Sequence, residues 1–176
     1  MRRNLLFLDR DGVLIEDRDY GELGDPFRLK IRPGVIEGLE KLKKLNFHFF
    51  VFSNQAGINK GYYKISDVIK NNERIDQFLE TKGLKVLKYY FCPHLPSELC
   101  SCRKPNLSLY RQWTKDFPFD YEHRFMIGDK DSDIEFGKRL NMITIYLKTR
   151  YPLTSKPDFV VHNFEEAINY ICSYFF

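Results

Sequence analysis

Two aspartates, Asp9 and Asp11, lie directly after a short apolar run and are followed by Gly12. Carboxylates at i and i+2 point the same way if the strand geometry persists, and Gly12 lets the backbone turn sharply behind them. Neighbouring carboxylates are costly unless a cation or a shared proton relieves their repulsion. A third acid, Asp129, follows another apolar run, and together with Asp9 and the backbone carbonyl of Asp11 it could hold Mg²⁺, which prefers oxygen ligands. A solvated turn is the alternative interpretation.

Two further residues, Ser53 and Lys104, have the chemistry of a cradle for a phosphoryl group. A hydroxyl and an ammonium group can stabilise the oxygens that carry negative charge while a phosphoryl group is transferred. Together with the aspartates, they predict phosphoryl transfer as the reaction.

Four candidate ligands for a second metal lie between positions 92 and 102 of the chain: Cys92, His94, Cys100 and Cys102. Three thiolates and one imidazole suit tetrahedral zinc with no open coordination position, so we expect a structural zinc ion. In a reducing compartment this spacing indicates a metal site more than a disulfide framework. The loop runs directly into Arg103 and Lys104, so zinc would fix where these cations lie. Chance clustering of buried cysteines is the alternative.

The elements that must position these residues are short apolar runs that alternate with segments of helical period, a pattern that predicts parallel βαβ units. The predicted strands are Leu5–Leu8, Phe47–Phe52, Val86–Phe91, Phe125–Ile127, Thr144–Leu147 and Phe159–Val161. Helices are predicted from Val35 to Leu45, over the segment that carries Val68, Ile75 and Leu79 and ends at Gly83, and over Leu107–Lys115 and Ile134–Leu140. Ligands of open parallel sheets bind outside the carboxyl ends of the strands. Since polar residues follow the first four predicted strands, we expect one convergent site.

The composition fits one compact domain over residues 1–176. With 43% hydrophobic and 30% charged residues, the chain can build a core under an ordinary surface, which excludes disorder. The net charge is +4 and the basic residues are scattered singly or in pairs, which favours a small phosphorylated metabolite over nucleic acid as the partner. No signal-peptide region and no stretch of about 20 apolar residues occurs, so we expect a cytoplasmic monomer with no membrane contact.

Four segments in order resemble the motifs of the haloacid dehalogenase (HAD) superfamily of phosphatases, subfamily IIIA. The segment Leu8–Leu14 resembles the first motif, and Ser53, Lys104 and Gly128–Asp133 fall on the second, third and fourth. Any one motif is weak evidence, but four at strand ends are strong. The resemblance covers most of the chain and implies a three-layer Rossmann-like α/β fold with a central parallel sheet, no large cap domain and a zinc-binding loop.

The resemblance also implies how the site works. Asp9 is expected to attack phosphorus to form an aspartyl-phosphate, and Asp11 to protonate the leaving oxygen and then activate water. Asp133 would share a helical face with Asp129 and is expected to support the magnesium site from behind its ligands. Asp131 is expected to cap the helix or to face solvent.

Within the superfamily, the zinc loop resembles that of two groups, the phosphatases of D-glycero-D-manno-heptose 1,7-bisphosphate and of histidinol phosphate. Asp17 and Tyr20 resemble an Asp-x-x-Tyr segment that the heptose enzymes place beside the substrate, and Lys130 resembles the lysine of their Asp-Lys pair. Only five residues separate His94 from Cys100, as in histidinol phosphatases. We expect the heptose substrate, with histidinol phosphate as the alternative, because the 176 residues hold no dehydratase domain like the one often fused to the histidinol enzyme. The residues expected to contact the substrate are Asp17, Tyr20, Asn54, Arg103 and Lys130.

Two other classes of function stay open. Polynucleotide 3′-phosphatases resemble the same motifs, but the chain lacks interleaved basic and aromatic residues that would favour binding to nucleic acid. A zinc-stabilised binding module without catalysis is the second, and the complete set of catalytic residue types argues against it.

Overall fold

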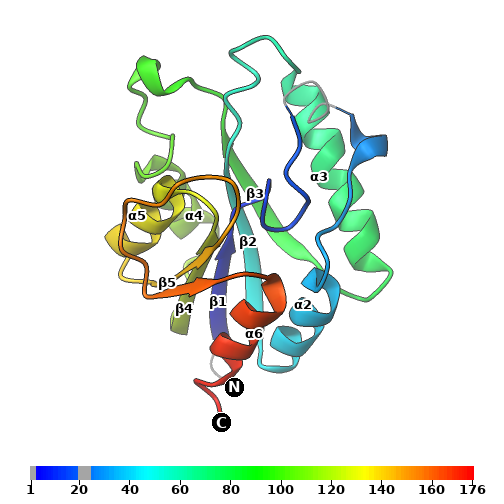
Figure 1. Ribbon diagram of the computed structural model, residues 1–176, viewed down its shortest axis with the longest axis vertical. Coiled ribbons are helices and arrows are strands. Elements are labelled where there is room, and N and C mark those ends of the chain that lie inside the picture. The colour runs from blue at the N-terminus through cyan, green and yellow to red at the C-terminus, as the bar shows by residue number, and fades with distance from the viewer. Residues whose placement is uncertain (1–2, 20–24) are drawn as a thin grey trace.

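The computed structural model describes residues 3–19 and 25–176, and within these ranges a parallel six-stranded sheet forms the centre of the molecule (Figure 1). The strands are β1 (Arg3–Leu8), β2 (Phe47–Asn54), β3 (Val86–Cys92), β4 (Tyr121–Gly128), β5 (Ile143–Leu147) and β6 (Phe159–Val161). Their order across the sheet is β3-β2-β1-β4-β5-β6, and every neighbouring pair is parallel. All six predicted strands are confirmed.

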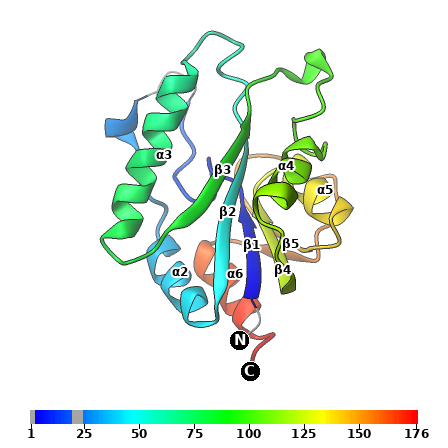
Figure 2. The same ribbon diagram turned by 180° about the vertical axis from the view of Figure 1, so that it is seen from behind.

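Helices cover both faces of the sheet, as the two opposite views show (Figures 1 and 2). They are α2 (Val35–Lys44), α3 (Ile65–Glu80), α4 (Ser108–Asp116), α5 (Asp131–Arg139) and α6 (Phe164–Cys172). Leu6 and Leu8 of β1 pack in one core with α2, α3 and α6, whereas Leu5 and Phe7 point to the opposite face and pack with α4 and α5. The molecule therefore has three layers, as the resemblance implies.

Helix α6 has no counterpart among the predicted helices. Asn163 caps it by accepting a hydrogen bond from the N–H of Glu166 at 2.8 Å. The helix packs close to α2, where a Cβ atom on Gly38 would come within 2.6 Å of Ile168. Its buried residues recur at helical spacing and are Phe164, Ala167, Ile168 and Ile171. The periodic pattern is therefore present in the sequence, although it spans only two turns of an aromatic-rich tail.

The strand order reverses between β1 and β4, so the carboxyl ends of these two strands meet at the crevice where such sheets bind ligands. Asp9 directly follows β1, and its N–H donates to the Ile127 carbonyl of β4 at 3.0 Å. Gly12 has a φ of +84°, and a Cβ atom there would lie 2.3 Å from a carboxylate oxygen of Asp129. A glycine is thus required for the loop after β1 to approach Asp129 this closely.

The connections that leave the sheet near the crevice contain little helix or strand. In the described ranges, the segment from β1 to α2 contains the 3₁₀ turn η1 (Pro26–Arg28) and the segment from β3 to α4 contains η2 (Pro96–Glu98), without a folded cap domain. No helix in these ranges is both long and apolar enough to cross a bilayer.

Candidate active site

Three carboxylates and two lysines meet in a buried cluster at the ends of β1 and β4. Lys104 Nζ lies 2.9 Å from Asp9 Oδ1 and 2.5 Å from Asp133 Oδ1. Lys130 Nζ lies 3.2 Å from Asp129 Oδ1 and 3.8 Å from Asp9 Oδ2. We call these five residues the charged cluster. It brings together residues more than 90 positions apart in the chain, as the predicted convergence of strand ends requires.

The charges of this cluster do not balance, because three carboxylates face two ammonium groups. Burial raises the pKa of Asp129 to about 7, with Lys130 opposing the rise and the neighbouring carboxylates adding to it. Burial would also raise the pKa of Asp9, but the charges of Lys104 and Lys130 outweigh it and hold that pKa below its ordinary value. One oxygen each of Asp9, Asp129 and Asp133 lies within 4.8 Å of the others. These residues therefore fit a divalent cation, which would supply the missing positive charge.

Asp133 is fixed by its own helix start as well as by Lys104. Its Oδ2 accepts hydrogen bonds from the N–H groups of Asp129 and Lys130 at 3.2 and 3.1 Å, which caps α5. A Cβ atom on Gly128 would collide with Asp133, so the glycine lets the carboxylate reach back beneath the strand end. Since both oxygens of Asp133 are engaged, its contacts agree with the expected supporting position. Asp131 accepts hydrogen bonds from Thr154 and Ser155.

Asp11 belongs to a second polar network beside the cluster. Gln55 Nε2 donates to Asp11 Oδ2 and to Ser53 Oγ, both at 2.6 Å, and Tyr63 donates to the Gln55 amide oxygen at 2.9 Å. The Arg10 guanidinium, which is 1% exposed, donates to both oxygens of Asp11 at 3.2 and 3.3 Å. The network fixes the Asp11 carboxylate at the wall of the pocket and places the Ser53 hydroxyl behind it.

Lys104 lies in the loop that follows β3 and is held by the end of β2. Its backbone N–H donates to Asn54 Oδ1 at 3.0 Å, Asn54 Nδ2 donates to its carbonyl at 3.2 Å, and its ammonium group also donates to the Phe52 carbonyl.

The four predicted zinc ligands lie just upstream of Lys104 and converge: Cys92, His94, Cys100 and Cys102. The Sγ–Sγ and Sγ–Nδ1 separations between contacting pairs are 2.9–3.6 Å. The edges of a tetrahedral zinc site are about 3.5–3.8 Å, so the four side chains fit zinc.

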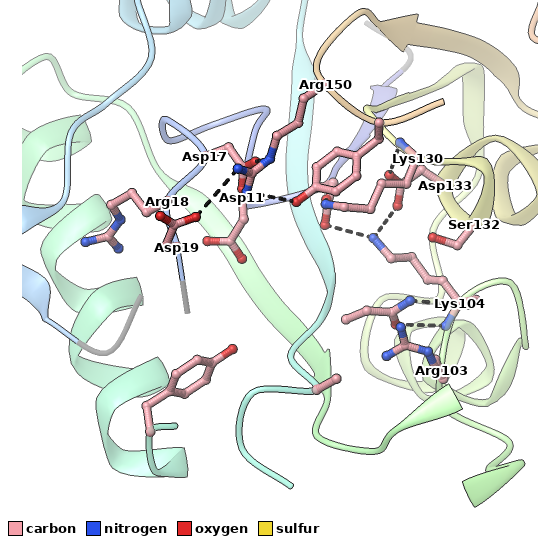
Figure 3. A pocket seen from close by; sticks show the side chains of 15 residues that line it. Asp11, Asp17, Arg18, Asp19, Arg103, Lys104, Lys130, Ser132, Asp133 and Arg150 are labelled. Carbon is pink, nitrogen blue, oxygen red and sulfur yellow. Dashed lines mark hydrogen bonds and ion pairs between the residues drawn. The ribbon is translucent and has the colours of Figure 1, made fainter. Parts of the chain in front are cut away.

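A pocket opens over the charged cluster and is walled on its outer side by loop residues (Figure 3). We call five of these residues the rim: Asp17, Asp19, Arg103, Arg150 and Tyr151. Arg150 Nε lies 2.8 Å from Asp17 Oδ2, and Arg150 Nη1 lies 3.6 Å from Asp19 Oδ1. The Tyr151 ring lies under Lys130 Nζ, 4.3 Å from its centroid. The rim thus connects the loop after β5 to the loop after β1 and touches the charged cluster at Lys130.

Most of the predicted site residues share this pocket or lie directly behind it. Asp9, Asp11, Asp17, Asn54, Arg103, Lys104, Lys130 and Asp133 line the pocket. Ser53 and Asp129 are buried but do not line the pocket. Ser53 is linked to Asp11 through Gln55, which donates to both, and Asp129 accepts a hydrogen bond from Lys130. Tyr20 lies outside the described residues. Trp113 of α4 is 4% exposed and packs with Phe7 and Phe50 on the opposite side of the sheet from α2.

Among the residues of the site that have no counterpart among the predicted site residues are Arg10, Gln55, Thr149, Arg150 and Tyr151. Gln55 directly follows β2 and Arg10 is the second residue after β1, so their position at strand ends was a usable signal. The other three follow β5, a strand whose end carries no acid, and Thr149 reaches the cluster by donating to Asp129 Oδ2 at 3.2 Å. No pattern in the sequence marks that loop.

Comparison with known proteins identifies relatives along nearly the whole chain. The family model described as HAD-hydrolase-like matches residues 101–167. The D-glycero-beta-D-manno-heptose-1,7-bisphosphate 7-phosphatase of Helicobacter pylori strain J99 is 37% identical over 172 residues, which cover 94% of this chain and 95% of that protein. The histidine biosynthesis bifunctional protein HisB of Blochmanniella floridana is 34% identical over 143 residues, which cover 81% of this chain but 40% of HisB.

A solved structure has the same fold. The crystal structure of D,D-heptose 1,7-bisphosphate phosphatase from B. bronchiseptica complexed with magnesium and phosphate superposes with a TM-score of 0.83 at 20% sequence identity. The match covers 97% of this chain and 99% of that chain. At this identity the structural match shows that the two proteins share the arrangement of sheet and helices. Membership of the family is shown by the relatives that are similar in sequence.

Proposed function

The chain belongs to the haloacid dehalogenase superfamily and is a phosphatase, and from this premise we propose that it removes the 7-phosphate of D-glycero-D-manno-heptose 1,7-bisphosphate. The observation that carries the proposal is the pairing of a complete phosphoryl-transfer cluster with a rim that contains Asp17. The heptose phosphatase from Helicobacter pylori, 37% identical over 94% of this chain, supports the same substrate.

In this proposal Asp9 is the nucleophile. Its low pKa keeps the carboxylate ionised near neutral pH, and Lys104 holds one of its oxygens so that the other can attack. An oxygen of Asp9 bonds to phosphorus while the ester bond to the sugar breaks, and Asp11 gives its proton to the leaving sugar oxygen. Asp11 then takes a proton from water, which attacks the aspartyl-phosphate, frees the Asp9 carboxylate and releases phosphate.

Lys104 of the charged cluster and Ser53 of the neighbouring polar network would hold the transferred phosphoryl group, aided by Mg²⁺. We propose that Asp9, Asp129 and the backbone carbonyl of Asp11 are the magnesium ligands. When bound, the ion would neutralise charge between these carboxylates and the phosphoryl oxygens. Asp133 would keep Lys104 and the start of α5 in register with the ligands.

We propose a structural role for zinc. The four-ligand set at Cys92, His94, Cys100 and Cys102 leaves no open position for catalysis. Arg103 directly follows the last ligand, and its guanidinium donates to the His94 carbonyl at 3.1 Å, so its place depends on the folded loop. Zinc would therefore fix Arg103 and Lys104 at the pocket without entering the reaction.

Histidinol phosphate is the second candidate substrate. Five residues separate His94 from Cys100, as in histidinol phosphatases, and HisB of Blochmanniella floridana is 34% identical over 81% of this chain. The test is a phosphate-release assay with Mg²⁺ in which heptose 1,7-bisphosphate and histidinol phosphate compete, with nucleotides and 3′-phosphorylated DNA as further arms. We expect a higher kcat/KM for the heptose. A preference for histidinol phosphate would overturn the proposal, and no release from any of them without added Mg²⁺ is expected.

A further inference from the structure

Arg150 extends into the pocket from a segment that is anchored on both sides of it. Thr149 donates to Asp129 Oδ2 at 3.2 Å, and the Tyr151 ring lies against Lys130. The Tyr151 carbonyl also accepts a hydrogen bond from the Tyr146 hydroxyl of β5 at 2.6 Å. The residues on either side of Arg150 are therefore tied to the charged cluster, and the arginine between them has a defined place at the pocket (Figure 3).

The guanidinium of Arg150 is oriented without being enclosed. It forms ion pairs with Asp17 at 2.8 Å and Asp19 at 3.6 Å, but 59% of its side chain is exposed. Exposed ion pairs contribute little to stability because solvent screens them. A guanidinium carries five N–H donors in a planar fork, so one edge can face Asp17 while others bind an anion. The ion pair with Asp17 thus orients the Arg150 guanidinium at the pocket and leaves some of its N–H donors available to a ligand.

The cations of the charged cluster lie around the reacting group. Lys104 pairs with Asp9 and Asp133, and Lys130 pairs with Asp129 and Asp9, at the place where the transferred phosphoryl group would lie. A sugar bisphosphate brings a second dianionic phosphate, which needs a cation outside this cluster. Arg150 is such a cation, and it is already supported by two carboxylates.

We propose that Arg150 binds the second phosphate of a sugar bisphosphate, the one that is not transferred, while Asp17 holds the guanidinium in place. This inference rests on the proposed function and names the group that selects its substrate. Histidinol phosphate has an ammonium group and an imidazole in place of a second phosphate, so Arg150 would favour the bisphosphate over it.

The experiment compares Arg150→Gln with the wild-type enzyme on heptose 1,7-bisphosphate and on the same heptose with a 7-phosphate alone. We expect kcat/KM for the bisphosphate to fall by about 10- to 150-fold, mostly through a higher KM, because the contact is remote from the reacting atoms. The monophosphate should lose less than about 3-fold. Arg150→Lys, which keeps the charge and loses the fork, should lie between.

A matched control is Lys148→Gln, which removes one positive charge from the same loop at an exposed residue that does not line the pocket. It should keep the ratio of the two kcat/KM values at the wild-type level. If Arg150 only positioned Asp17 against the sugar, Arg150→Gln would reduce both substrates equally, and that result would overturn the inference. No loss on either substrate would overturn it as well. Failure of the proposed function would show in a different measurement, a higher kcat/KM of the wild-type enzyme for histidinol phosphate than for heptose 1,7-bisphosphate.

Discussion

The charged cluster and the rim face each other across one pocket but are built in opposite ways. Asp9, Lys104 and Asp129 are at most 4% exposed, and each is held by contacts from strand ends or from a helix start. Arg150 and Asp19 are exposed and come from loops. Buried charges interact strongly and lose much when a partner is removed, whereas exposed ones are screened. The cluster is therefore suited to chemistry on any phosphate monoester, and the rim to the choice among them.

The largest expected effect lies at the nucleophile. Asp9→Asn should abolish phosphate release, by about 10³-fold or more, because the amide is nearly isosteric with the carboxylate but a poor nucleophile. Asp11→Asn should slow turnover by about 10²-fold or more. The losses should be the same for heptose bisphosphate and for p-nitrophenyl phosphate, measured as kcat/KM. Circular dichroism and zinc content serve as controls and should match the wild type. An Asp9→Asn enzyme with near-normal turnover would end the proposed mechanism.

Zinc removal should affect both regions at once, because the loop from Cys92 to Cys102 leads into Arg103 of the rim and Lys104 of the cluster. Cys100→Ser should lower the free energy of unfolding by about 3 kcal/mol, which shifts Tm by about 6–12 °C in a chain of this size. Activity should fall on every substrate.

Cys172→Ser is the matched control, since Cys172 is the last residue of α6, packs partly buried against the core and is far from the zinc ligands in the sequence. Metal analysis should give about one zinc per chain for the wild type and for Cys172→Ser, and less for Cys100→Ser. Protein purified without chelators and found to lack zinc would refute the site.

Lys130 sharpens the comparison because it touches both regions. The sequence predicts a substrate contact, whereas the structure also pairs it with Asp129 and Asp9. Lys130→Ala should therefore cost roughly 10- to 150-fold on heptose bisphosphate and a similar factor on p-nitrophenyl phosphate. If the generic substrate loses less than about 3-fold, Lys130 acts with the rim alone.

The same contrast explains how far the sequence could lead. Asp9, Ser53 and Asp129 each lie at or just after the end of an apolar run, and the topology of parallel sheets brings such ends together, so both the fold and the cluster could be predicted. The zinc ligands were equally visible, because their chemistry depends on residue type and spacing. Arg150 was not, because its loop has no periodic pattern and its role depends on which side chains lie across the pocket. Helix α6 was missed for a different reason, its short pattern within an aromatic-rich tail.

The smallest expected effect tests whether the rim and the cluster communicate. Tyr151 is the rim residue whose ring contacts Lys130, at 4.3 Å from the ammonium nitrogen. A partly exposed cation–π contact contributes about 0.5–1 kcal/mol, so Tyr151→Leu should lower kcat/KM by about 2- to 5-fold, on generic and preferred substrates alike, by loosening Lys130. Tyr151→Phe keeps the ring face and should stay within about 1.5-fold of the wild type. A loss in Tyr151→Leu confined to the bisphosphate would instead mean that Tyr151 acts by supporting Arg150, and the two regions would then be independent, each tuned by its own contacts.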